Sequence, residues 1–335
     1  MTEFSVILPL RNQGQYLQEC VNSILSQTYT NFELIILAHD SDEATLACLN
    51  SLTDPRIKMI YAENIDGIAG NWARIKEVAK KEFMTIIGYD DILKPRFLQT
   101  IDELIIKYPE ASLYHTHFDF IDSNGKVIRQ CKPMPEKLLQ DELLAEFLKG
   151  TIDAMGTGYV MRSADYESVG GISAAYPNLL FADFDLWLQL AGLKYEVIAT
   201  ENCFSFRVHQ SVTSSSSDAK LHEGLGAFIN FLAALKLHQP ATAAVIHKHG
   251  GKFLLRYAKS YSHRILRTPK NKRNEISVKR FISYTRQLAT QLNIDGNYLP
   301  EKEKSVNLAG IIDGSKWLSA LFLFVRSRYG KPFKK

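Results

Sequence analysis

Two adjacent carboxylates, Asp90 and Asp91, are the strongest candidates for chemistry in this sequence. They follow the apolar run 83–87 and precede Pro95. Carboxylates at the end of a buried strand are costly unless they hold a cation or hydrogen-bond donors. Mn²⁺ or Mg²⁺ suits such oxygen ligands and is often shared with substrate phosphates, so the pair could anchor a diphosphate through a metal ion. The alternative is a turn or a helix N-cap ahead of Pro95.

A second pair of carboxylates, Asp183 and Asp185, opens a predicted helix with an apolar face. We interpret Asp183 as a general base that points into a cleft, and Asp185 as a support for the helix. A base must lie within hydrogen-bond reach of the proton that it removes. The alternative is that Asp183 only caps the helix and favours its dipole.

Two further polar stretches follow predicted strands. Arg207-Val-His209 precedes the serine-rich segment 211–217, where a histidine could contact a phosphate or a metal ion. Near the start, Pro9 ends the first strand, and the residues from there to Asn12 lie where a nucleotide could bind.

Alternating strands and helices are expected to position these groups. Apolar, β-rich runs predict strands, and helical spacing of apolar residues predicts helices between them. The expected strands are 4–9, 32–37, 57–61, 83–87, 112–116 and 195–200, and the expected helices are 16–26, 44–52, 68–80, 97–106, 142–148 and 183–193. This alternation predicts an α/β fold with a mostly parallel sheet covered on both faces, whose ligands bind at the carboxyl ends of the strands.

The composition is that of an ordinary globular protein. The chain has 335 residues, 46% of them hydrophobic and 23% charged, and a formal net charge of +4. Its four cysteines form no CxxC pair, which argues against a zinc site or a disulfide framework. The first residues lack a signal-peptide pattern, and no apolar run is long enough to span a bilayer. We therefore expect a cytoplasmic location, with peripheral association to the inner face of the cell membrane as an extension of that expectation.

In their order along residues 1–215, these segments resemble the family 2 inverting glycosyltransferases of bacterial surface-polysaccharide type, which have the GT-A fold. The resemblance rests on several motifs taken together. They are Phe4-Ser-Val-Ile-Leu-Pro-Leu-Arg-Asn12, Ile87-Gly-Tyr-Asp-Asp-Ile-Leu-Lys-Pro95, Gly156-Thr-Gly-Tyr-Val-Met-Arg162, Val169-Gly-Gly-Ile172, Ala182-Asp-Phe-Asp-Leu-Trp-Leu188 and Arg207-Val-His209. The resemblance implies a Rossmann-like domain over 1–215, followed by a helical, basic region over 216–335.

The resemblance also implies roles for individual residues. Asp183 is expected to be the catalytic base, and Asp90 and Asp91 to bind the ribose and the metal–diphosphate. His209 is expected to touch the metal ion or a phosphate. The residues expected to line the nucleoside pocket are Pro9, Asn12, His39, Asp40 and Asn71.

Three positions depart from the family's usual pattern. His39 stands where the family usually has a carboxylate for the base, and Asp40 or Asp42 is expected to compensate. Gly88 stands where many members have the first aspartate of their metal-binding motif, and Ala182 replaces a usual glutamate before the base.

The last third of the chain is rich in cations. They gather in 252–280 and after the apolar segment 317–325, where Arg326 and Arg328 are followed by further lysines. An apolar helix with an aromatic edge and basic flanks suits an anionic membrane surface. The alternatives are a solvated helical surface with a buried final helix, and nucleic-acid binding, which we do not expect because no recognised nucleic-acid module is present.

Together these features predict an enzyme of the hexosyl- or N-acetylhexosaminyltransferase type. It would move a sugar from a nucleoside-diphosphate sugar, most typically a UDP-sugar, to a hydroxyl of a glycan or lipid-linked acceptor in polysaccharide or lipopolysaccharide synthesis. Two alternatives stay open. One is a sugar nucleotidyltransferase, although Leu10-Arg-Asn-Gln-Gly-Gln15 is a poor version of its glycine-rich loop. The other is a non-catalytic relative that binds glycans or nucleotides.

Overall fold

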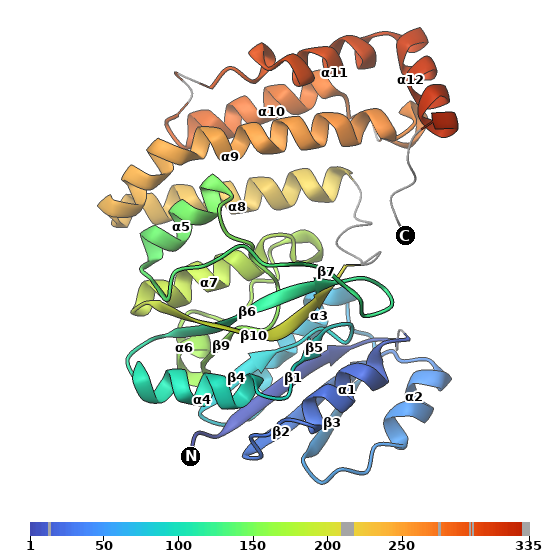
Figure 1. Cartoon of the computed structure of the whole chain (residues 1–335). Helices are drawn as coiled ribbons and strands as arrows, with labels where there is room; N and C mark the ends of the chain where they lie inside the picture. Colours follow the sequence, from blue (N-terminus) through green and yellow to red (C-terminus); the bar gives the residue numbers. More distant parts are fainter. Residues whose placement is uncertain (13–14, 209–217, 274–275, 295, 297, 330–335) are drawn as a thin grey trace. The chain divides into compact units, whose positions relative to one another are not determined.

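A computed structural model describes the chain except for residues 13–14, 209–217, 274–275, 295, 297 and 330–335 (Figure 1). The chain divides into two compact units. The first contains residues 1–143 and 151–213, and the second contains residues 144–150 and 214–335. Each unit is described by itself below.

The first unit is built on one sheet with the strand order β3-β2-β1-β4-β9-β6-β10-β5, to which β7 and β8 add at β6 and β10. The strands are β1 (Phe4–Leu10), β2 (Phe32–His39), β3 (Ile57–Ala62), β4 (Phe83–Ile86), β5 (Ile92–Leu93), β6 (Leu113–Ile121), β7 (Val127–Gln130), β8 (Lys137–Leu138), β9 (Val160–Arg162) and β10 (Glu196–Arg207). Every residue of β1 and of β2 is buried, which explains why both sequences are mostly apolar rather than alternating, and the polar Ser5 and Glu33 hydrogen-bond to each other.

The expected parallel sheet is present, with short antiparallel additions. β1 pairs in parallel with β2 and β4, β2 pairs in parallel with β3, and β6 pairs in parallel with β10. β9 lies between β4 and β6 and is antiparallel to both, and β5, β7 and β8 also pair antiparallel. The prediction of a mostly parallel sheet therefore holds for the long strand pairs, and the complete sheet is mixed.

Helices connect these strands along the chain. Those before α8 are α1 (Leu17–Leu25), α2 (Glu43–Asn50), α3 (Gly67–Ala73), α4 (Phe97–Lys107), α5 (Gln140–Lys149), α6 (Ser163–Ser168) and α7 (Ala182–Leu193). The helix expected over 68–80 is shorter, because α3 gives way to a 3₁₀ turn at Arg74–Glu77. Arg74 is buried there and donates to the Ile60 carbonyl oxygen, so the chain turns inward where a continuous helix was expected.

The second unit is helical, as expected. Its main helices are α8 (Asp218–His238), α9 (Pro240–Arg267), α10 (Val278–Gln291), α11 (Lys304–Gly314) and α12 (Lys316–Tyr329) (Figure 1). α9 is the centre of this unit, since α8, α10, α11 and α12 all pack against it. Among the described helices, none is by itself both long and apolar enough to cross a membrane, and only α11 and α12 taken together, with a bend of 110° between them, pass that test by length and composition.

Candidate active site

The carboxyl ends of β1, β2 and β4 meet at one edge of the sheet, because these neighbouring strands are parallel. The side chain of Asn71 ties two of them together by donating to the Leu10 carbonyl oxygen at 3.4 Å and to the Leu37 carbonyl oxygen at 3.1 Å. Pro9 lies opposite Leu37 in the same register. The residues predicted to surround a nucleoside therefore gather at this edge.

The turns that follow β1 and β2 are joined by Asn12. Its Oδ1 accepts a hydrogen bond from the Asp42 amide at 3.1 Å, and Asp42 in turn caps α2 by accepting from the Thr45 amide at 2.8 Å. Asn12 itself is exposed. Its side-chain oxygen therefore orders the turn, while the residue stays accessible from solvent.

His39 and Asp40 end β2 in different environments. The His39 side chain is buried, and its Nδ1 lies 3.2 Å from Asp40 Oδ2. Asp40 is exposed, has a left-handed backbone with φ of 41°, and accepts hydrogen bonds from the amides of Asn64 and Ile65. The hydrogen bond donated by the Asn64 amide is the main reason that the pKa of Asp40 lies below its ordinary value. Asp40 therefore holds the loop after β3 in place.

Arg74 supports the same edge of the sheet, and no role was predicted for it from the sequence. It is buried and donates to Asn71 Oδ1 at 2.8 Å and to the Ala38 carbonyl oxygen at 3.2 Å. Asn71 is thus fixed by hydrogen bonds at both ends of its amide group. In this structure Asn71 positions the strand ends, and its contact with a nucleoside stays a prediction.

Asp91 is a buried carboxylate whose two oxygens are both hydrogen-bonded within the protein. Its Oδ2 accepts from the Thr157 hydroxyl at 2.6 Å, and its Oδ1 accepts from the Arg207 amide at 3.0 Å. Burial, followed by the negative charge of Asp90, raises the pKa of Asp91 well above its ordinary value. The two hydrogen bonds act in the opposite direction and favour the charged form.

Gly88 explains how two carboxylates fit into so small a turn. A Cβ at this position would lie 2.6 Å from Asp90 Oδ1 and 3.2 Å from Asp91 Oδ2. Any side chain there would displace the Asp90 carboxylate. The glycine that departs from the usual motif is therefore the residue that lets Asp90 and Asp91 lie side by side against the backbone.

Arg207 fixes the turn that carries these carboxylates. Its side chain is buried and donates from Nε to the Asp90 carbonyl oxygen at 2.8 Å and from Nη2 to Glu19 at 2.6 Å. It also donates to the Asp122 carbonyl oxygen at 3.1 Å, and its guanidinium lies 4.2 Å from the centre of the Tyr16 ring. The resemblance implied that Arg207-Val-His209 binds a ligand. In the structure, Arg207 of this element hydrogen-bonds to Asp90 and Asp91.

Asp183 lies in the first turn of α7 and is only partly exposed. Its Oδ1 accepts from the Phe184 amide at 2.8 Å, and a Cβ on Gly156 would lie 3.3 Å from its Oδ2. Burial raises the pKa of Asp183 to about 6, although the Phe184 amide acts against this shift. The carboxylate is therefore partly desolvated but keeps an open side, as a general base requires.

The segment 155–157 brings Asp183 and Asp91 into one region. The Met155 carbonyl oxygen accepts from Trp187 Nε1 at 2.9 Å, which fastens this segment to α7. Gly156 then lies against Asp183, and Thr157 donates to Asp91. The convergence of distant carboxylates predicted from the sequence is thus produced by three consecutive residues, of which Thr157 had no assigned role.

Asp185 has the supporting role predicted for it. Its Oδ2 accepts from the Tyr176 hydroxyl at 2.6 Å and its Oδ1 accepts from Gln189 Nε2 at 2.7 Å. The bond from Tyr176 ties α7 to the preceding loop, and the bond from Gln189 lies within α7. Asp185 is buried and its oxygens are occupied, whereas Asp183 is the more accessible of the two.

The predicted metal ligands are described only in part. His209 lies outside the described residues. Among the residues that are described, no three His, Cys, Asp or Glu side chains form a group that could hold a metal ion. Asp90 and Asp91 nevertheless fit a shared divalent cation, because the repulsion that raises the Asp91 pKa would be relieved by a positive charge beside the pair.

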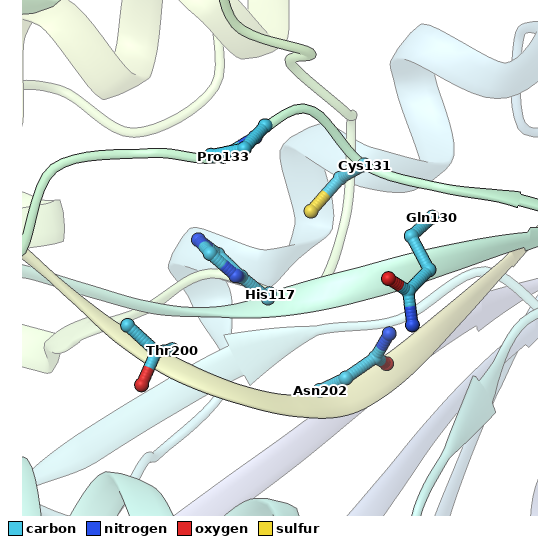
Figure 2. A pocket seen from close by; sticks show the side chains of 6 residues that line it. All are labelled: His117, Gln130, Cys131, Pro133, Thr200 and Asn202. Carbon is cyan, nitrogen blue, oxygen red and sulfur yellow. The ribbon is translucent and has the colours of Figure 1, made fainter.

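A separate small pocket of about 130 Å³ lies between the paired strands β6 and β10 on one side and the segment 130–133 on the other (Figure 2). The residues that line it are His117, Gln130, Cys131, Pro133, Thr200 and Asn202. His117 Nε2 accepts from the Met134 amide at 3.2 Å, and Asn202 is held by Lys94 and Asp119. None of the predicted site residues lines this pocket.

Replacing Arg207 with Met should destabilise the fold by about 2–4 kcal/mol, because three hydrogen bonds to Asp90, Asp122 and Glu19 are lost inside the protein. The measurement is urea unfolding followed by circular dichroism. The matched control is Arg96→Met, since Arg96 is about half exposed and pairs with Glu103 and Glu201 at the surface. The control should change stability by less than about 1 kcal/mol, and equal effects of the two variants would contradict the role given to Arg207.

Asp183→Asn should stabilise the folded protein by about 1–3 kcal/mol at pH 8. The folded pKa is about 6, above the ordinary 3.8, so ionisation at higher pH costs stability and a neutral amide avoids that cost. Below pH 3.8 the carboxyl is protonated in both states, and the advantage should vanish. The control Asp185→Asn should destabilise at pH 8, because the bonds from Tyr176 and Gln189 need both oxygens. A destabilised Asp183→Asn at pH 8 would rule out the desolvation described here.

Comparisons with known proteins agree with the fold and the motif order. The family model described as glycosyl transferase family 2 matches residues 5–170. Glycosyltransferase GlyG of Streptococcus pneumoniae is 31% identical over 123 residues, which cover 36% of this chain and 41% of that protein. A glycosyltransferase of Rickettsia conorii is matched over 31% of its length, so the chain spans less than half of either relative.

A longer match and a solved structure extend the comparison. The Escherichia coli UDP-Glc:alpha-D-GlcNAc-diphosphoundecaprenol beta-1,3-glucosyltransferase WfgD is 26% identical over 235 residues, which cover 67% of this chain and 86% of that protein. The structure of S. aureus TarS 1–349 in complex with UDP-GlcNAc superposes with a TM-score of 0.64 at 13% identity, covering 99% of this chain and 93% of that one. The structural likeness supports the predicted GT-A fold with its helical C-terminal region, and the family match confirms the predicted resemblance. Residues 5–170, about half of this chain, match glycosyl transferase family 2.

Proposed function

We propose that this chain is an inverting glycosyltransferase. It moves a sugar from a nucleoside-diphosphate sugar to a hydroxyl of a glycan or lipid-linked acceptor, in the synthesis of a cell-surface polysaccharide or lipopolysaccharide. The observation that carries the proposal is the partly exposed, desolvated Asp183 beside the segment that also holds Asp91. The family match and the relatives named above support the same reaction class.

Asp183 is the proposed general base. With a pKa of about 6 it is ionised at neutral pH, yet it binds a proton more tightly than an ordinary aspartate does. Both properties suit removal of a proton from an acceptor hydroxyl as that oxygen attacks the anomeric carbon. A single displacement of this kind inverts the configuration, whereas glycoside hydrolysis uses two flanking carboxylates and water as the acceptor.

Asp90 and Asp91 are proposed to act at the leaving group. We assign the ion to the Asp90–Asp91 pair, in which both oxygens of Asp91 also accept hydrogen bonds from within the protein. Mn²⁺ or Mg²⁺ held there would neutralise charge on the departing nucleoside diphosphate. His209 remains a proposed additional ligand.

The donor is proposed to be a UDP-sugar, bound along the edge formed by the ends of β1 and β2. TarS was solved with UDP-GlcNAc, and the printed name of WfgD gives UDP-glucose as its donor. The proposed nucleoside contacts are Pro9, Asn12, His39, Asp40 and Asn71. Because Asp40 and Asn71 hold neighbouring backbone, their replacement should loosen the pocket as well as remove a contact.

Asp183→Asn should lower kcat by about 10²–10⁴-fold while donor binding is preserved, because only the base is removed. Donor binding is measured by calorimetry with UDP-sugars, and turnover by release of UDP. The control is Asp141→Asn, a carboxylate in the first turn of α5 with no proposed part in the reaction. Normal turnover of Asp183→Asn would remove the assignment.

The pH dependence gives a second test of the base. At saturating metal ion, kcat/KM of the wild type should fall as the pH drops through about 6, since the protonated carboxyl cannot accept the acceptor's proton. A profile that stays flat down to the ordinary aspartate value of 3.8 would show that Asp183 does not titrate as proposed.

Metal dependence separates this proposal from its rivals. Removing divalent ions with EDTA should abolish transfer, and adding Mn²⁺ should restore it. Asp90→Asn should lower the apparent affinity for Mn²⁺, measured through donor binding, by about 10–100-fold. Donor binding that is accompanied neither by transfer nor by slow donor hydrolysis would favour a non-catalytic relative. Formation of a nucleotide sugar from a nucleoside triphosphate and a sugar phosphate would favour a nucleotidyltransferase.

A further inference from the structure

The outer face of α12 carries an apolar stripe that nothing in the described structure covers. The stripe consists of Trp317, Leu318, Leu321, Phe324 and Val325, all of which are exposed. Trp317 is 79% exposed and Phe324 is 56% exposed. The spacing of four, three and four residues from Trp317 through Leu321 to Phe324 and Val325 places these side chains along one side of the helix.

The opposite side of α12 is the side that packs on the protein. Ser319 is buried, and its hydroxyl donates to the Ile312 carbonyl oxygen at 2.8 Å. The half-buried Phe322 and Leu323 lie on the same side as Ser319, so α12 is apolar on its packed side and carries the exposed stripe on the other. The expected buried final helix, one of the alternatives from the sequence, is therefore wrong for this face.

Positive charge surrounds the stripe. α12 contains Lys316 at one end and Arg326 and Arg328 at the other, and no acidic residue. Arg326 lies seven residues after Ser319 and so on the packed side of α12, where burial, followed by the charge of Arg267 on α9, lowers its pKa. Lys316 and Arg328 are exposed and are the cations that lie with the stripe.

The acidic groups nearby are already neutralised by partners within the unit. Asp313 of α11 is buried, pairs with Arg273 and accepts from the Val278 amide at 2.8 Å. Glu303, at the start of α11, pairs with Lys259 at 2.7 Å. The basic side chains of α12 are therefore not balanced by acidic residues on the same helix.

We propose that the α12 stripe lies in the headgroup region of an anionic membrane, with Trp317 and Phe324 inserted and Lys316 and Arg328 on the lipid phosphates. Exposed apolar side chains with basic flanks match the two attractive forces at such a surface. α12 is about 21 Å long, shorter than the ~30 Å apolar core of a bilayer, so it would lie along the surface rather than cross it.

A second copy of the chain is a poorer occupant of this face. A symmetric contact would place the same stripe on both subunits. It would then bring the cations of one α12 against those of the other, with no acidic residue on either helix to balance them. Lipid phosphates supply the missing negative charge.

The test is co-sedimentation of the full-length chain with vesicles of phosphatidylcholine alone and of phosphatidylcholine mixed with phosphatidylglycerol. We expect binding to the anionic vesicles, weaker binding at high salt, and at least about tenfold weaker binding for Trp317→Ser/Phe324→Ser, because two inserted side chains are removed. The matched control is Val127→Ser/Ile128→Ser on β7, which removes two similarly exposed apolar residues and should bind as the wild type does.

Tryptophan fluorescence gives an independent readout. Trp187 is buried and Trp72 is half-buried in the first unit, so the exposed Trp317 should dominate a blue shift on addition of anionic vesicles, and Trp317→Phe should lose that shift while it still sediments with them. Thermal unfolding checks that every variant folds. Equal binding of all variants, no binding to anionic vesicles, or no preference for them would overturn the proposal. A wild-type dimer that Trp317→Ser/Phe324→Ser converts to a monomer, without vesicle binding, would assign the stripe to a second copy.

Discussion

The hydrogen bonds to the buried Asp91 carboxylate are the constraint on which the candidate site depends. A carboxylate in this position is destabilised by the loss of water and by the neighbouring Asp90. Thr157 and the Arg207 amide compensate, and they come from two different parts of the sheet. The same two bonds that make Asp91 tolerable therefore bring the end of β10 and the segment before β9 to the carboxyl end of β4.

The position of Asp183 follows from that arrangement. Once Thr157 is fixed on Asp91, Gly156 must lie one residue away, and its missing side chain leaves room for the Asp183 carboxylate. Trp187 secures the other side by its bond to Met155. The site thus keeps a partly desolvated carboxylate that lowers the stability of the folded state at neutral pH, which is a cost often found where a group must accept a proton.

The sequence allowed the frame of the site to be predicted, because its signals are local. The apolar runs of β1, β2 and β4 are buried on both faces, and parallel pairing necessarily gathers the residues that follow them. The contacts that complete the site are different in kind. Thr157 and Arg207 reach Asp91 across 66 and 116 residues, and no local pattern encodes such pairs. A strand after the turn at 156 is predicted from the sequence, but the antiparallel direction of β9 and the inward turn at Arg74 escaped prediction, since tertiary contacts decide both.

The central claim is that Asp90 and Asp183 face one bound donor from opposite sides of its scissile bond. An experimental structure with Mn²⁺ and an intact UDP-sugar measures this most directly. The account predicts the diphosphate and the ion beside Asp90, with the anomeric carbon facing the Asp183 carboxylate. A donor bound elsewhere, or an anomeric carbon turned away from Asp183, would contradict it.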